Sequence, residues 1–160
     1  MTVYRVPPEC REEAALFSVV GQRHPENTLS EELYLEPGPI LHLPEGATLL
    51  SSRSCRGSLR QRLLLLQCEP ADRLWFLIDP LCHLFTLPCP DGAGQRICEE
   101  QSLMLRKKHP VYDSPEFVCQ YCVIADHGQL RVHLFDTPQS IQEKLHLAES
   151  LDIENIIYIM

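Results

Sequence analysis

Two apolar runs, one near the middle of the chain and one at its C-terminal end, stand out in the pattern of hydrophobic positions. The first is Arg73–Ile78 and the second is residues 153–160. Uninterrupted apolar runs of this length are typical of strands covered on both faces, as in parallel sheets. We therefore predict that Arg73–Ile78 and Ile153–Tyr158 are neighbouring parallel strands.

The segment 136–151, which precedes the second run, predicts an amphipathic helix. Asp136 or Thr137 is suited to cap its start, and Pro138 fits the first turn, where backbone amides have no partner within the helix. Helical spacing places its apolar residues in one stripe and most of its polar residues on the other faces. The stripe consists of Ile141, Leu145, Ala148 and Leu151, whereas Gln142, Glu143, Lys144 and Glu149 are expected on the other faces.

The remaining patterned segments predict further strands and helices. Phe117–Ala125 and Gln129–Phe135 are expected to form an antiparallel hairpin, with Asp126, His127 and Gly128 at the turn. Short helices are expected at Ser58–Gln67 and Glu99–Lys108. Thr2–Val6 is compatible with a short strand. Strands and helices in this order predict an α/β or α+β fold.

Composition and charge exclude several classes of partner. The chain has 160 residues, of which 44% are hydrophobic and 22% charged, which suits a globular domain or a domain with a small module. The formal net charge of −8 disfavours nucleic acid and anionic membranes as partners. The apolar block Leu63–Leu66 is too short to span a bilayer, and the first residues lack the apolar core of a secretion signal. We expect a soluble protein made in the cytoplasm.

The cysteines raise the question of a metal site. Cys119 and Cys122 have the spacing of a zinc-binding pair, but no second pair completes four ligands. Their neighbours read as a strand, which would direct the two thiols to opposite faces. We therefore predict no metal and no cofactor. The eight cysteines are Cys10, Cys55, Cys68, Cys82, Cys89, Cys98, Cys119 and Cys122.

No nucleophilic catalytic group is indicated. Cys82 and His83 are adjacent, so in a strand they would face opposite ways. His133 lies within an apolar strand and is interpreted as a core histidine with its hydrogen bonds satisfied. Trp75, the only tryptophan, lies inside an apolar run and is interpreted as core rather than as a sugar-stacking platform.

A series of segments from residue 68 to the end resembles the C-terminal part of glycoside hydrolase family 18, especially spore-associated members that act on peptidoglycan. In that family the seventh barrel strand precedes a small α+β insertion, a helix and the eighth strand. The resemblance implies a partial, barrel-derived domain with such an insertion, not a complete TIM barrel. The matching segments are Arg73–Ile78, residues 87–92, residues 97–103, Val111–Phe117, Val132–Asp136, residues 140–145 and Ile153–Ile159.

The departures from that family indicate lost catalysis. Its acidic signature D-x-x-D-x-D-x-E, which supplies the general acid, does not occur here. Asp152 and Glu154 have a D-x-E spacing but precede the final strand, whereas barrel chemistry lies at the carboxyl ends of strands. The aromatic residue expected near Ile159 is missing, and residues 79–82 replace the glycine and tyrosine usual after the seventh strand.

The N-terminal part is harder to interpret. Tyr4-x-Val6 and the segment Leu35–Pro44 weakly resemble a LysM repeat, a small glycan-binding module. We therefore divide the chain into an N-terminal segment, 1–50, and a family-18-like region, 51–160.

The resemblance implies a non-catalytic remnant of a glycan hydrolase that acts in binding or assembly, in a spore or cell-wall context. The alternative is a residual hydrolase acting on peptidoglycan or chitin-like oligosaccharides. No catalytic residue is assigned. The candidate ligand-binding residues are Asp113, Glu116 and Asp136. A partial barrel leaves strand edges open, so a homodimer is the expected assembly. The resemblance makes a glycan the expected ligand.

Overall fold

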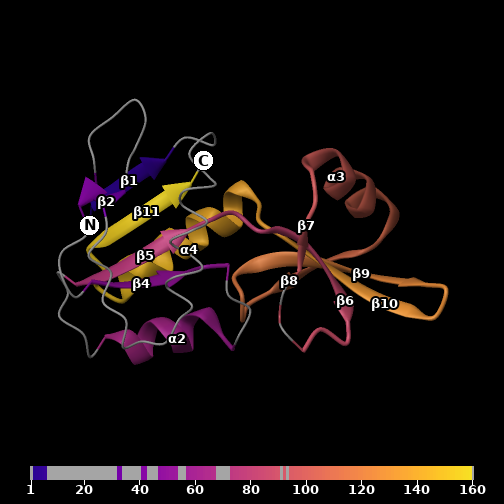
Figure 1. Cartoon of the computed structure of the whole chain (residues 1–160), viewed down its shortest axis with the longest axis horizontal. Helices are drawn as coiled ribbons and strands as arrows, with labels where there is room; N and C mark the ends of the chain where they lie inside the picture. The colour runs from indigo at the N-terminus through magenta and orange to yellow at the C-terminus, as the bar shows by residue number, and fades with distance from the viewer. Residues whose placement is uncertain are drawn as a thin grey trace.

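The computed structural model describes residues 2–6, 32–33, 41–42, 47–53, 57–67, 73–90, 92 and 94–159. A parallel sheet and an antiparallel sheet lie beside each other (Figure 1). The elements in chain order are β1 (Thr2–Val6), β2 (Glu32–Leu33), β3 (Leu41–His42), β4 (Thr48–Ser51), α2 (Leu59–Leu66), β5 (Leu74–Ile78), β6 (Cys82–Leu87), β7 (Gln95–Arg96), α3 (Glu99–Lys108), β8 (Val111–Ser114), β9 (Cys119–Asp126), β10 (Gln129–Phe135), α4 (Pro138–Ser150) and β11 (Asn155–Ile159).

The parallel sheet confirms the central prediction from the apolar runs. Its strand order is β1-β11-β5-β4, and every neighbouring pair is parallel. Within the pair of predicted strands, Trp75 lies beside Asn155 and Ile78 beside Tyr158. The antiparallel sheet, with order β7-β6-β10-β9-β8, and helix α3 are inserted between β5 and α4. Trp75 is 5% exposed, which confirms it as core.

The first and the last strands are neighbours in this sheet. β1, which confirms the strand predicted at Thr2–Val6, pairs with β11 from the opposite end of the chain. A closed (β/α)8 barrel brings its first and last strands together in the same way. The sheet has four strands and does not close in the part that the structure describes. This confirms the predicted α/β class, with a partial barrel and an α+β insertion.

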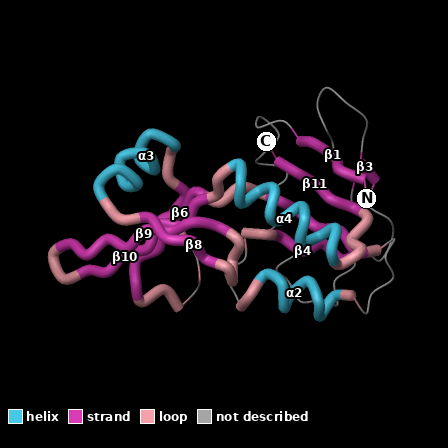
Figure 2. Tube along the Cα trace, turned by 180° about the vertical axis from the view of Figure 1, so that it is seen from behind, coloured by secondary structure: helices cyan, strands magenta, loops and turns pink. Residues whose placement is uncertain are grey.

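Helices α2 and α4 cover the same face of the parallel sheet (Figure 2). Among the described helices, the two that pack on this sheet lie on the same face, as helices do on the outside of a barrel wall. The core between helices and sheet is built from buried aliphatic and aromatic side chains. It contains Leu59, Leu63, Leu74, Phe76, Ile78, Ile141, Ala148, Leu151, Ile153 and Ile156.

Helix α4 begins with a capping box, in which two reciprocal hydrogen bonds join Thr137 and Ser140. This confirms the predicted helix start. The Thr137 side chain accepts a hydrogen bond from the Ser140 backbone N–H, and the Ser140 hydroxyl accepts one from the Thr137 N–H. Pro138 occupies the first turn. The predicted faces need one correction: Lys144 is fully buried, whereas Leu145 is only half-buried. The physical reason is an ion pair between Lys144 and Asp136.

The antiparallel sheet contains the predicted hairpin of β9 and β10. Its loop has two residues, His127 and Gly128, both with positive φ, as a tight hairpin turn requires. Asp126 pairs with Gln129 instead of lying in the turn, and β9 starts at Cys119 instead of residue 117. Helix α3 has the predicted bounds and contacts β10.

Some N-terminal predictions lie outside the described residues. Of the LysM-like segment at 35–44, only Leu41–His42 is described, as strand β3 paired with β2. β1 and β4 belong to the same sheet as the later strands β5 and β11. None of the helices that the structure describes is long and apolar enough to cross a membrane.

Candidate functional site

The carboxyl ends of β4 and β5 hold a cluster of polar side chains. Asp79 directly follows β5, and Arg53 lies two residues after β4. Because the two strands are parallel neighbours, these ends meet at one edge of the sheet. In α/β barrels this edge carries the functional groups. We refer to Arg53, Asp79 and His83 as the edge cluster.

Hydrogen bonds from Arg53 join the three side chains of the edge cluster. The Arg53 Nη1 donates to the Asp79 Oδ2 at 3.1 Å, and its Nη2 donates to the His83 Nε2 at 2.9 Å. Ser52 joins the ends of the strands, since its hydroxyl accepts from the Asp79 N–H at 3.2 Å. Asp79 is fully buried, and no described group hydrogen-bonds to its Oδ1. The cluster thus pairs a buried carboxylate with the guanidinium group of Arg53.

The pKa of His83 is lowered to about 4. Burial is the main cause, followed by the positive charges of Arg53 and Arg96. Arginine can only donate, so the Nε2 of His83 must keep its lone pair to accept the bond from Arg53. His83 is therefore neutral near pH 7 and serves as an acceptor.

Lowering the pH from 7 to 5 is expected to reduce the free energy of unfolding by roughly 2 kcal/mol through His83 alone. The unfolded chain binds a proton on this histidine near pH 6.5, whereas the folded chain resists it until about pH 4. Stability is therefore lost as the pH falls through this window. Denaturant unfolding at several pH values measures the slope. The His83→Gln variant should show a flatter slope, and an equal slope in both proteins would contradict the assignment.

His133 forms a second buried polar pair with Ser102. The His133 Nδ1 donates to the His83 carbonyl oxygen at 3.1 Å, and the Ser102 hydroxyl donates to the Nε2 at 2.9 Å. Burial lowers the pKa of His133. A serine bonded to a neutral imidazole resembles a nucleophile with its base. However, Ser102 is 1% exposed and His133 is fully buried, so the pair binds α3 to β10 rather than reaching a substrate. This confirms His133 as a satisfied core histidine.

Asp136 lies between β10 and α4 and is held by three groups. Both of its oxygens lie 2.6 Å from the Lys144 Nζ. Its Oδ1 also accepts from the Ser140 hydroxyl, and its Oδ2 from the Leu81 N–H, both at 2.8 Å. The side chains of Asp136 and Lys144 are 2% and 0% exposed. Asp136 therefore fixes the start of α4 relative to the residue before β6.

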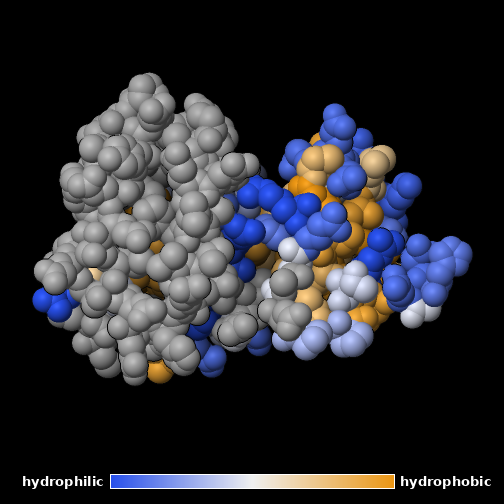
Figure 3. Space-filling model, viewed as in Figure 1, coloured by the Kyte–Doolittle hydropathy of each residue, from blue (hydrophilic) through white to orange (hydrophobic). Residues whose placement is uncertain are grey.

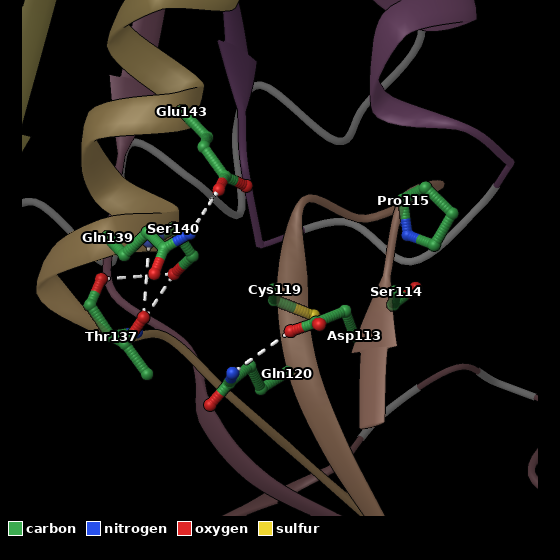
Figure 4. A pocket seen from close by; sticks show the side chains of 9 residues that line it. All are labelled: Asp113, Ser114, Pro115, Cys119, Gln120, Thr137, Gln139, Ser140 and Glu143. Carbon is green, nitrogen blue, oxygen red and sulfur yellow. Dashed lines mark hydrogen bonds between the residues drawn. The ribbon is translucent and has the colours of Figure 1, made fainter. Parts of the chain in front are cut away.

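Asp113 lines a polar cavity of about 340 Å³ between the β8–β9 edge and the first turns of α4 (Figure 4). Its Oδ1 accepts a hydrogen bond from the Gln120 Nε2 at 2.9 Å. Figure 4 shows Glu143 and Gln139 on the facing helix, where the Gln139 amide donates to the Glu143 carboxylate. The remaining lining is mostly small and polar. It consists of Ser114, Pro115, Cys119, Thr137 and Ser140.

The three predicted ligand-binding residues therefore occupy different surroundings. Asp113 lines the polar cavity, and Asp136 lies directly before Thr137, which also lines it. The Glu116 side chain is exposed and does not line this cavity. Its carbonyl oxygen accepts from the N–H of Leu59 at the start of α2. The structure thus brings Asp113 and the Asp136 segment to one cavity and leaves Glu116 outside it.

The cysteine pair lies in β9, as predicted. Cys119 belongs to a small apolar cluster with Phe85 and Leu134, whereas Cys122 pairs with His133 on the opposite face. Burial raises the pKa of the Cys122 thiol and also that of Cys82. Among the described residues, no group of three or more histidine, cysteine, aspartate or glutamate side chains is placed to hold a metal ion.

The sequence-based list of site residues omitted the edge cluster. One signal was present, since Asp79 directly follows a buried strand in β/α architecture, where barrel strands carry their polar groups. Arg53 had no local signal, because β4 was not predicted. The partner of Lys144 could not be identified either, since the ion pair joins a helix to the residue before its cap.

No protein-family model matches the sequence, and no curated protein matches it. Two solved structures show a similar fold. The spore cortex-lytic enzyme SleL of Bacillus cereus has a TM-score of 0.54 and 13% identity, over 98% of this chain and 37% of that chain. YdhD of Bacillus subtilis, described as a sporulation-specific glycosylase, has a TM-score of 0.51 and 12% identity, over 69% of this chain and 43% of that chain. This chain therefore spans less than half the length of either protein.

Proposed function

We propose that this chain is a non-catalytic remnant of a glycan hydrolase, derived from glycoside hydrolase family 18, that binds or organises glycan in a spore or cell-wall context. The fold supports the derivation, because it corresponds to part of a cortex-lytic enzyme and of a protein described as a glycosylase. The pairing of β1 with β11 supports an origin from a barrel that once closed.

The observation that carries the non-catalytic assignment is the state of the buried carboxylates. Glycosidases act with two carboxyl groups beside the scissile bond, and one of them must hold a proton to donate. Asp79 and Asp136 lie near the functional edge of the sheet, but they are engaged in ion pairs with Arg53 and Lys144. Their side chains are 0% and 2% exposed, so neither is placed to donate a proton to a glycosidic oxygen.

The polar cavity beside Asp113 is the proposed glycan-binding site. Sugar hydroxyls both donate and accept hydrogen bonds, so carboxylate and amide side chains are suitable partners. Asp113 and Gln120 on β8–β9 face Gln139 and Glu143 on α4 across this cavity. Asp136 acts indirectly in this proposal, because it holds the first turn of α4 in place.

Asp113→Ala is expected to weaken binding of a peptidoglycan fragment about tenfold, because it removes a charged acceptor and frees the Gln120 amide. Isothermal titration with peptidoglycan and chitin oligomers measures the affinity. Asp126→Ala, at an exposed hairpin position, is the matched control and should bind like the wild type. Absence of binding by the wild type would refute the proposal.

The same oligomers test the alternative of a residual hydrolase. Incubation followed by mass spectrometry of the products is expected to show intact oligomers. Release of shorter products that is lost in Asp113→Asn or Asp136→Asn would establish hydrolysis and overturn the non-catalytic assignment.

A further inference from the structure

A second cavity, of about 490 Å³, lies between α3 and α4 on another side of Asp136. Ile141 and Leu145 of α4, with Pro80 after β5, supply an apolar part. Arg106 of α3 and Tyr158 at the end of β11 supply polar groups. An apolar surface with a few polar groups is the usual composition of a small-molecule site.

Arg106 is held in a fixed position at this cavity. Its guanidinium carbon lies 4.8 Å from the centre of the Phe135 ring, and its Nη2 donates to the exposed carboxylate of Glu99. Its Nε is buried without a hydrogen-bond partner, and the described residues provide no hydrogen bond for its Nη1. The buried Nε is closed to a ligand, so the Nη1 is the donor left for an anionic oxygen.

The charges that face this cavity permit a bound anion. Asp136 lines it, but both of its oxygens are occupied by Lys144, so that pair is neutral as a whole. Glu99 is 70% exposed, and an ion pair with so exposed a carboxylate is weak. A ligand carboxylate can therefore displace Glu99 from Arg106.

We propose that this cavity binds a small carboxylate carrying a short aliphatic group, with the carboxylate on Arg106 and the aliphatic group against Ile141 and Leu145. Tyr158 and Gln142 also line the cavity and bring a hydroxyl and an amide group as further polar partners. This cavity shares Thr137 with the polar cavity beside Asp113 but has otherwise different lining residues, and the proposal does not depend on glycan binding. Figure 3 shows apolar residues exposed among hydrophilic ones over the part that carries α3.

The test uses the full chain labelled with ¹⁵N and titrated with N-acetyl-leucine, followed by nuclear magnetic resonance. Saturable shifts are expected at the amides of α4's first turns and of Tyr158. N-acetyl-leucine amide, which lacks the carboxylate, should cause no saturable shift. Equal binding of the amide, or no saturation by the carboxylate, would overturn the proposal.

Variants of α3 separate binding from structure. Arg106→Gln should weaken binding about tenfold, whereas Lys107→Gln, an exposed cation that does not line the cavity, should change it less than about twofold. Glu99→Gln removes the competing carboxylate and should tighten binding, which a merely structural role of the ion pair would not produce. Weaker binding by Glu99→Gln would count against the proposal.

Discussion

Asp136→Ala is expected to lower the free energy of unfolding by about 3–5 kcal/mol, because it leaves the buried ammonium group of Lys144 without its counter-ion. Lys144 is fully buried, and both Asp136 oxygens contact its Nζ. The change also removes the acceptor for the Leu81 N–H and the Ser140 hydroxyl, which join α4 to the segment before β6. Chemical denaturation at pH 7 measures the loss.

The double variant Asp136→Ala with Lys144→Met is the control for this prediction. It removes both charges and replaces the lysine by an apolar side chain of similar length, so the uncompensated buried charge disappears. The double variant should be more stable than Asp136→Ala alone. If Asp136→Ala is the more stable of the two, the buried ion pair does not determine the loss.

Leu63→Ala is the second change with a large expected effect, a loss of about 2–5 kcal/mol in the free energy of unfolding. Leu63 lies on α2, is fully buried, and belongs to the core between the helices and the parallel sheet. Removing its side chain loses the hydrophobic transfer term and leaves a cavity in a close-packed region. Thermal or denaturant unfolding of the purified variant measures the effect.

Leu65 offers a matched control on the same helix. It is the same residue type two positions away, but its side chain is 76% exposed. Leu65→Ala should change the free energy of unfolding by no more than about 0.5 kcal/mol. Similar losses for the two variants would mean that α2 does not pack on the sheet through the face described.

The buried Lys144 shows where reasoning from helical periodicity fails. Spacing alone assigned the lysine to an outer face and Leu145 to the buried stripe. In the structure the buried face of the helix also carries Lys144, which is paired with Asp136. Leu145 lies half-buried at the edge of a cavity. Periodicity describes which residues share a face but carries no information on a charged partner that lies before the cap.

The candidate site was predictable only in part. Asp113 and Asp136 could be proposed because they are carboxylates within segments that resemble glycoside hydrolase family 18, and the structure brings Asp113 and the residue after Asp136 to one cavity. Glu116 belongs to the same segment as Asp113, but its side chain is exposed and the contact it makes with α2 is through its backbone carbonyl. The edge cluster of Arg53, Asp79 and His83 joins segments that only the sheet brings together.

The sequence by itself determined the local elements: the buried strands β5 and β11, the hairpin of β9 and β10, and the capped helix α4. Apolar runs, turn residues and caps act between near neighbours in the chain, so their signal is present in the sequence. Only the tertiary structure decided that β1 pairs with β11, that Asp79 meets Arg53, and that two cavities form beside Asp136. These contacts join distant segments, and their energy depends on burial and geometry that exist only once the sheets are assembled.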